Sequence, residues 1–253
     1  MLISHSHRFI FVHIYKTAGI SISSALIPFA ASPRQLSVDR KFNRLGLSFL
    51  YPRVIRGDST VRDWISNGMN NVFERMRFLD EHPQPVKEPH VTAAEIVDAV
   101  GEETFNAYFS FAIVRNPWDW QVSLYRFALE TAMSLPKLAA YARGLAEERR
   151  TYSRFGSFDD YIRWRCSEDV VLQTDFVCSP SGELLVDYVG KYESLATDFQ
   201  TICERIGIEP SLPHLNEPSS APRPYQEHYT PETVELVRRA FAPDIERFGY
   251  EFD

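Results

Sequence analysis

A short apolar run that passes through a turn into a helical segment constrains the fold of this chain more than any other feature. Residues 8–14 (RFIFVHI) are rich in Phe, Ile and Val, which is typical of a buried strand. Gly19 then opens a helical stretch over residues 20–29. A strand, a tight turn and a helix form the opening unit of nucleotide-binding α/β folds. We therefore expect a three-layer, P-loop-like α/β domain with a central, mostly parallel sheet flanked by helices.

Later segments continue the alternation of strands and helices. Residues 108–115 (YFSFAIVR) indicate a second buried strand, and Pro117 suits the first turn of the helix expected to follow it. Thr92 and Glu95 form a capping-box pattern before a helix over residues 93–100. Other patterns predict a helix at 62–79, one at 157–165 capped by Ser157, a hairpin turning at 180–182, a helix at 195–206 ending at Gly207, and a last helix from Pro231, capped by Thr230.

Length and charge restrict the class of protein. A chain of 253 residues fits one large α/β domain, so residues 1–253 are expected to form a single unit. The net charge of −7 disfavours a nucleic-acid partner, which would require a basic face. Residues 34–62 are locally basic. This segment is either a solvated face or a rim that attracts an anionic acceptor or a nucleotide.

Cysteine usage and apolar runs bear on location. The three cysteines include no C-x-x-C pair, which disfavours a disulfide framework and a zinc site. No apolar run reaches membrane-spanning length, and the N-terminus lacks a signal-peptide pattern. We expect no membrane span, no metal and a cytoplasmic location, with the cysteines acting as small buried apolar residues.

The segment 13–21 (HIYKTAGIS) joins the first strand to the first helix. Backbone N–H groups at a helix N-terminus, together with Lys16, make an anion site for a phosphate or phosphosulfate. Thr17 and Ser21 offer hydroxyl donors, and Gly19 allows the backbone to approach a ligand closely. No glycine precedes Lys16 at the spacing of a Walker loop. The alternative is an ordinary strand–helix turn.

A second candidate site lies in residues 111–127. Arg115 ends the second strand, where a guanidinium can clamp a phosphate with two hydrogen bonds. Ser123 lies two turns into the following helix and can add a hydroxyl donor. The alternative is a structural arginine paired with Asp119.

Together, FVHIYKTAGISI and VRNPWDWQVSLYRF resemble the two PAPS-binding motifs of the Golgi-type and bacterial carbohydrate sulfotransferases, the family that includes heparan sulfate 2-O-sulfotransferase. The resemblance extends through the C-terminal segments, covers most of residues 8–253 and is weakest at 30–85. It implies a PAPS-dependent enzyme that needs no metal. Such an enzyme moves a sulfuryl group from PAPS to an acceptor hydroxyl on a carbohydrate or glycolipid by in-line displacement.

The resemblance also assigns roles to residues. It places the 5′-phosphosulfate at the first motif and the 3′-phosphate at Arg115 and Ser123, with Arg223 closing over the 3′-phosphate. The first-motif residues are Lys16, Thr17, Ala18, Gly19, Ile20 and Ser21. Two positions depart from the family pattern. Tyr15 replaces a usual Pro and is expected to alter only the loop's shape. Ile20 replaces a usual Thr or Ser and removes one hydroxyl donor.

His90 is the candidate general base. It follows a proline-rich segment and precedes the capped helix, and histidine suits proton abstraction near neutral pH. A His in a similar H-V context is the proposed base of the 2-O-sulfotransferases. The alternative for His90 is a capping or surface histidine. The alternative for Arg223 is an exposed loop residue. Trp118 and Trp120 are better explained by core packing than as an acceptor platform.

Two other functions compete with this hypothesis. A P-loop-type small-molecule kinase would need a fuller Walker loop and an acidic Mg²⁺ ligand at a strand end, where this chain has Arg115. A non-catalytic nucleotide-binding relative would not need Lys16 and His90, which are both present. Of the three functions, these residues favour the sulfotransferase.

Overall fold

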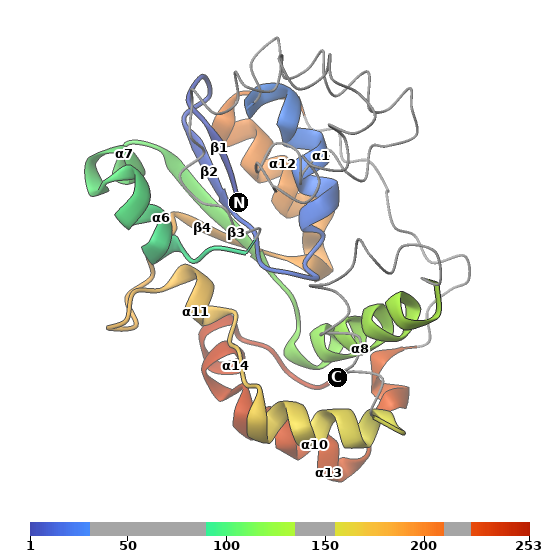
Figure 1. Ribbon diagram of the computed structural model, residues 1–253. Helices are drawn as coiled ribbons and strands as arrows, with labels where there is room; N and C mark the ends of the chain where they lie inside the picture. Colours follow the sequence, from blue (N-terminus) through green and yellow to red (C-terminus); the bar gives the residue numbers. More distant parts are fainter. Residues whose placement is uncertain (31–89, 135–154, 210–223) are drawn as a thin grey trace, which may run out of the picture.

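The structure, a computed structural model, describes residues 1–30, 90–134, 155–209 and 224–253 of the chain (Figure 1). The basic segment 34–62, the helix expected at 62–79 and Arg223 lie outside these ranges.

A four-stranded sheet forms the centre of the domain. Its order is β1 (Leu2–Ser4), β2 (Phe9–Val12), β3 (Phe109–Val114) and β4 (Tyr188–Lys191). β1 runs antiparallel to β2, whereas β2, β3 and β4 are mutually parallel. Every side chain of β2 is buried, as expected for a strand covered on both faces. The predicted α/β class and mostly parallel sheet are confirmed.

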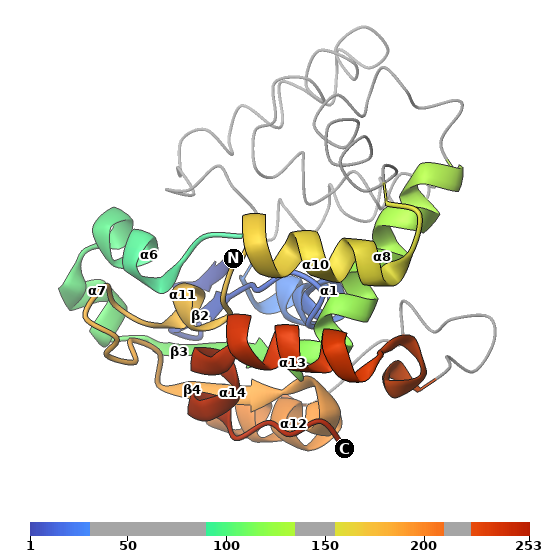
Figure 2. The same ribbon diagram turned by 90° about the horizontal axis from the view of Figure 1, so that it is seen from below.

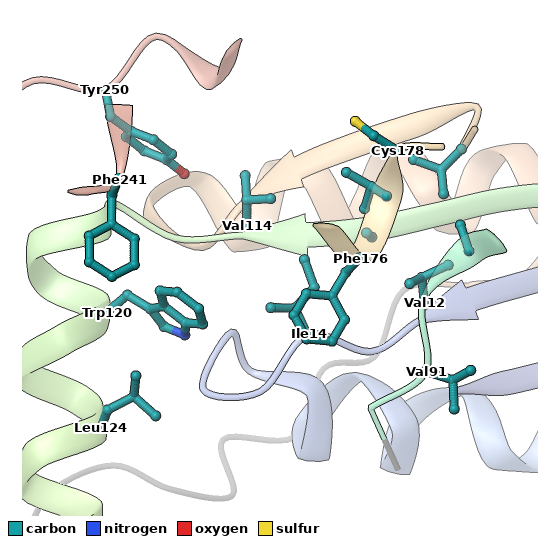
Figure 3. Close-up of a cluster of buried hydrophobic side chains, with 14 of the residues drawn as sticks. Val12, Ile14, Val91, Val114, Trp120, Leu124, Phe176, Cys178, Phe241 and Tyr250 are labelled. Atoms are coloured by element: carbon teal, nitrogen blue, oxygen red, sulfur yellow. The ribbon is translucent and has the colours of Figure 1, made fainter. Parts of the chain in front are cut away.

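The two faces of the sheet bury alternate side chains of the parallel strands. One face packs against α1 (Gly19–Ala30) and α12 (Leu195–Ile206). Its strand residues are Phe9, Phe11, Phe111 and Ile113. The opposite face packs against residues of α6 (Ala93–Val100), α8 (Pro117–Ser134) and α11 (Thr174–Val177) (Figure 3). Its strand residues are Ile10, Val12, Ala112 and Val114. Helices therefore cover both faces, as the three-layer prediction requires.

The remaining helices extend the layer opposite α1 and α12. They are α7 (Glu102–Asn106), α10 (Phe158–Glu168), α13 (Pro231–Ala240) and α14 (Ala242–Phe248), with the short 3-10 turn η3 (Tyr225–His228). A second 3-10 turn, η2 (Tyr192–Ser194), leads into α12 on the other side of the sheet. Figure 2 shows α10 and α13 lying side by side. α10 brings a buried arginine, Arg165, into the core beneath the β2–α1 turn.

Helix ends follow the sequence signals closely. The Thr92 hydroxyl accepts the Glu95 N–H at 3.1 Å, and the Glu95 carboxylate accepts the Thr92 N–H at 2.8 Å, which completes the capping box. Ser157 caps α10, and α12 ends at Gly207 with φ of 73°. These ends were predictable because each depends on contacts within one turn of chain.

The hairpin predicted around residues 180–182 is correct in its turn and wrong in the two extended strands that it was expected to join. The turn exists, with Gly182 at φ of 83°, but residues 174–177 form α11, and a single antiparallel bridge joins Cys178 to Leu184. The cause is a distant carboxylate. Asp244 accepts the N–H groups of Gln173 and Thr174, each at 2.8 Å, and so satisfies donors at the start of α11.

The tryptophans and two of the three cysteines are buried in the core, whereas Cys166 is half-buried at its edge. Trp118 and Trp120 are at most 1% exposed, so the packing interpretation is confirmed. Burial raises the pKa of Cys166 to about 12 and that of Cys203 to about 11. All three cysteines are free thiols. Within the described ranges, no helix is both long and apolar enough to cross a bilayer.

Candidate active site

The turn between β2 and α1 has an unusual backbone. Lys16 and Ala18 adopt φ of 65° and 61°, a region that costs a residue with a side chain about 1–2 kcal/mol. Neighbouring groups hold the turn. The buried Thr17 hydroxyl donates to Ile14 O at 2.9 Å, and Trp120 Nε1 donates to Tyr15 O at 2.7 Å. Backbone strain of this kind is concentrated at functional sites.

The start of α1 suits an anion. The first bond of the helix runs from Ile22 N to Ala18 O at 3.1 Å, and the N–H groups of the preceding residues have no acceptor inside the helix. The helix dipole adds positive potential at this end, and no acidic residue lies in the first turn. Lys16 adds a positive charge from the same turn, and its Nζ lies 4.3 Å from the centroid of the Phe127 ring. A phosphate or phosphosulfate would be stabilised here.

Gly19 is required by packing within the protein. A Cβ at this position would lie 1.8 Å from Nε2 of His13. The His13 ring also stacks on Phe11 at a centroid distance of 5.6 Å, so His13 is a packed residue, as expected. The close approach that selects glycine in this structure is therefore the contact of His13 with the start of α1.

Arg115 connects the second motif to the first. Its Nη1 donates to Lys16 O at 3.1 Å, and its Nε donates to Asp119 at 2.7 Å. The guanidinium lies 4.0 Å from the centroid of the Tyr192 ring. The structural ion pair with Asp119 is thus present, and it fixes the arginine beside the turn. A guanidinium carries five N–H donors, and the hydrogen bonds to Lys16 O and Asp119 use two of them.

Ser123 lies on the face of α8 that contacts the turn. Asp119, Ser123 and Phe127 are four residues apart and share one side of the helix. Arg115 pairs with Asp119, and Lys16 Nζ lies 4.3 Å from the centroid of the Phe127 ring. Ser123 therefore lies on the side of α8 that carries the contacts of Arg115 and Lys16.

His90 lies beside the same turn. Its Nδ1 is 3.1 Å from His13 O, and its ring centroid is 4.7 Å from that of His13. A carbonyl oxygen only accepts hydrogen bonds, so Nδ1 must donate. In the neutral imidazole the lone pair then belongs to Nε2, which is the atom able to accept a proton.

The structure therefore gathers most predicted residues at one end of the sheet. Lys16, Thr17 and Ala18 form the turn, Gly19, Ile20 and Ser21 begin α1, and Arg115, Ser123 and His90 lie around them. Ile20 is 60% exposed and contributes an aliphatic side chain to the first turn of α1. Arg223 lies outside the described residues.

Sequence reasoning missed the residue that supports Arg115. The buried Gln173 amide accepts from Arg115 N and donates to Arg115 O, each at 2.8 Å. Asp244 in turn holds Gln173. Burial is the largest influence on Asp244 and raises the pKa of its carboxyl, while its backbone hydrogen bonds act in the opposite direction. A lone Gln before a short helix carries no sequence signal for this role.

Potential metal ligands show no comparable grouping. Across the part of the chain that the structure describes, no three His, Cys, Asp or Glu residues are placed to hold a metal ion.

A mostly parallel sheet, with a helix that begins directly after the turn following β2, is typical of P-loop-like α/β domains. Comparison with protein-family models narrows this class, because residues 1–251 match the model described as the sulfotransferase family. The chain therefore belongs to the sulfotransferase family, whose reaction is sulfuryl transfer. Neither the search of curated proteins nor that of solved structures found a match at the threshold applied.

Proposed function

We propose that the protein transfers a sulfuryl group from PAPS to a hydroxyl of a carbohydrate or glycolipid. The observation that carries the proposal is the hydrogen bond from Arg115 Nη1 to Lys16 O at 3.1 Å, which joins the two motifs in one site. PAPS carries two anionic ends, and the two motifs provide two adjacent cationic groups. The carbohydrate acceptor is supported by the resemblance of both motifs to carbohydrate sulfotransferases.

Donor binding divides between the motifs. The N–H groups at the start of α1, with Lys16 and the hydroxyls of Thr17 and Ser21, would bind the 5′-phosphosulfate. Arg115 and Ser123 would bind the 3′-phosphate. Ile20 offers no hydroxyl, so the 5′ end has one donor fewer than in relatives with Thr or Ser there.

Transfer then follows from the placement of Lys16 and His90. The acceptor oxygen attacks sulfur, and a new S–O bond forms as the S–O bond to the 5′-phosphate breaks. The acceptor proton passes to Nε2 of His90. Lys16 stabilises the negative charge that accumulates on the leaving phosphate oxygen. The products are a sulfate ester and adenosine 3′,5′-bisphosphate (PAP).

The competing functions fit the site less well. A kinase would need an acidic Mg²⁺ ligand at a strand end, and the residue that follows β3 is Arg115. A binder without activity would gain nothing from a histidine whose Nδ1 is tied to His13 O.

One assay separates these functions. The purified protein is incubated with PAPS labelled with ³⁵S or with ATP labelled at the γ-phosphate, against a panel of monosaccharides, oligosaccharides and glycolipids. The proposal predicts a labelled sulfate ester of an acceptor when PAPS is the donor, and no labelled product when ATP is the donor. Label transferred from ATP would indicate a kinase, and tight PAP binding with no transfer to any acceptor would indicate a binder.

A further inference from the structure

Tyr15 connects the anion-binding turn to the proposed base. Its ring stacks on Trp120 at 5.0 Å and 28°, and it meets Phe176 edge-on at 5.8 Å and 82°. It also meets the His90 ring edge-on at 5.4 Å and 78°. T-shaped aromatic pairs of this kind are favourable and directional. One face of the His90 environment is therefore built by a residue of the turn itself.

The phenol of Tyr15 is anchored from a distant helix. Arg165 on α10 donates from Nη2 to Tyr15 Oη at 3.2 Å. Arg165 is only 2% exposed, and it also contacts Gln121 on α8 at 3.3 Å and pairs with Asp169. A buried guanidinium is costly unless its donors are used, so these contacts constrain its position. The Tyr15 ring is consequently fixed at its hydroxyl end as well as along its face.

The backbone of the turn is held by hydrogen bonds that do not use the Tyr15 side chain. Its shape is held by Thr17 on Ile14 O, by Trp120 on Tyr15 O and by Arg115 on Lys16 O. These contacts use backbone carbonyls and other side chains. Beyond the turn, the Tyr15 hydroxyl accepts from Arg165 and the Tyr15 ring meets His90. Of these two groups, histidine is the one that can take up a proton near neutral pH.

We infer that Tyr15 is a positioning residue for His90, fixing the imidazole plane so that Nε2 faces the acceptor hydroxyl. The inference rests on the proposed function. The bond from Nδ1 to His13 O fixes one atom of the imidazole, and the contact with the His13 ring at 4.7 Å already limits rotation about that bond. Contact with the Tyr15 ring restricts this rotation, and Arg165 keeps the Tyr15 ring in place. Misplacement of a reacting group by about 1 Å can cost roughly 10²-fold in rate.

The test compares Tyr15→Ala with Tyr15→Phe and with a matched control. Tyr108→Ala is the control, because the Tyr108 ring meets His5 at 5.7 Å and 77°, the same kind of contact at residues outside the site. We expect Tyr15→Ala to lower the rate of sulfate release from labelled PAPS roughly 10- to 100-fold. PAP affinity should change by no more than about twofold. Tyr15→Phe keeps the ring and should recover most of the lost rate.

A double-mutant cycle with His90 separates positioning from general damage. In a His90→Ala background, Tyr15→Ala should cause no further loss of rate. A further loss of the same size as in the wild type would overturn the inference. If His90→Ala alone leaves the rate unchanged, the proposed base fails instead.

Nuclear magnetic resonance of ¹⁵N-labelled histidine provides a readout that needs no turnover. The His90 ring signals, assigned by their absence in His90→Ala, should shift in Tyr15→Ala and stay unchanged in Tyr108→Ala. His90 signals that are identical in Tyr15→Ala and the wild type would overturn the positioning role whatever the activity shows.

Discussion

Substitution of Gly19 by alanine tests how the turn between β2 and α1 is built. The added Cβ would lie 1.8 Å from Nε2 of His13 and 1.9 Å from its Cδ2, whereas ordinary contacts begin at 3.4 Å. The His13 ring would therefore have to retreat by about 1.6 Å. His13 is buried, and its carbonyl oxygen accepts the bond from His90 Nδ1. The strain thus falls on the segment that positions both the turn and the proposed base.

We expect Gly19→Ala to lower the free energy of unfolding by an amount at the upper end of the range for overpacked interiors. Extra volume in a well-packed interior costs typically 1–3 kcal/mol, and a clash this short with a buried ring warrants about 3 kcal/mol. For a chain of this size, that lowers the melting temperature by roughly 6–12 °C. PAP affinity should fall as well, because the start of α1 moves with the clash.

Thermal unfolding by circular dichroism and calorimetric titration of PAP measure the two effects. Gly156→Ala is the matched control, since the nearest atom to its added Cβ is Asp160 Oδ2 at 3.7 Å. In a His13→Ala background, Gly19→Ala should cost less than about 1 kcal/mol, because the clashing ring is gone. A Gly19→Ala protein as stable as Gly156→Ala would refute the packing argument.

Three further substitutions test the roles assigned to single residues. Lys16→Ala should lower kcat roughly 10²-fold and weaken PAPS binding less, because the charge on the leaving oxygen is largest in the transition state. Steady-state kinetics that show only a raised KM would make Lys16 a simple binding residue. His90→Ala and His90→Asn should each lose roughly 10²–10⁴-fold in rate with unchanged PAP affinity. The wild-type rate should fall on acidification as the imidazole becomes charged. Near-normal activity of the two His90 variants would place the base elsewhere. Ile20→Thr should tighten PAP by roughly 2- to 10-fold in calorimetry, the value of one hydrogen bond; unchanged affinity would show that position 20 does not reach the 5′-phosphate.

Local signals carried most of the fold prediction. The caps at Thr92 and Ser157 and the stop at Gly207 were correct, because each is decided within one turn of chain. The buried strands were correct because their apolar runs are short and bounded. The hairpin arm failed because α11 begins where Asp244, some seventy residues later in the chain, accepts its N–H groups. A single sequence carries no signal for such a distant acceptor.

The residues of the candidate site were easier to select from the sequence than the residues that support them. Lys16, Arg115 and His90 were chosen from motif order and residue type, and the structure places them around one turn. Gln173 was missed, since a glutamine gives no sign that it will pair with the backbone of Arg115. Tyr15 was interpreted as a change of loop shape alone, yet the structure places its ring against His90, because its partners come from separate helices and from the segment before α6.

The most direct test of the central claim is the affinity of the wild-type protein for PAP compared with AMP, measured by calorimetry. The two nucleotides differ by the 3′-phosphate alone, which Arg115 and Ser123 are proposed to bind. One charged hydrogen bond contributes roughly 1.5–3 kcal/mol, so PAP should bind at least tenfold more tightly. Ser123→Ala should reduce this preference without affecting AMP, and it leaves the contact of Arg115 with Lys16 O in place. Equal affinity for PAP and AMP would contradict the assignment of the second motif to a 3′-phosphate, and with it the proposal that PAPS is the donor.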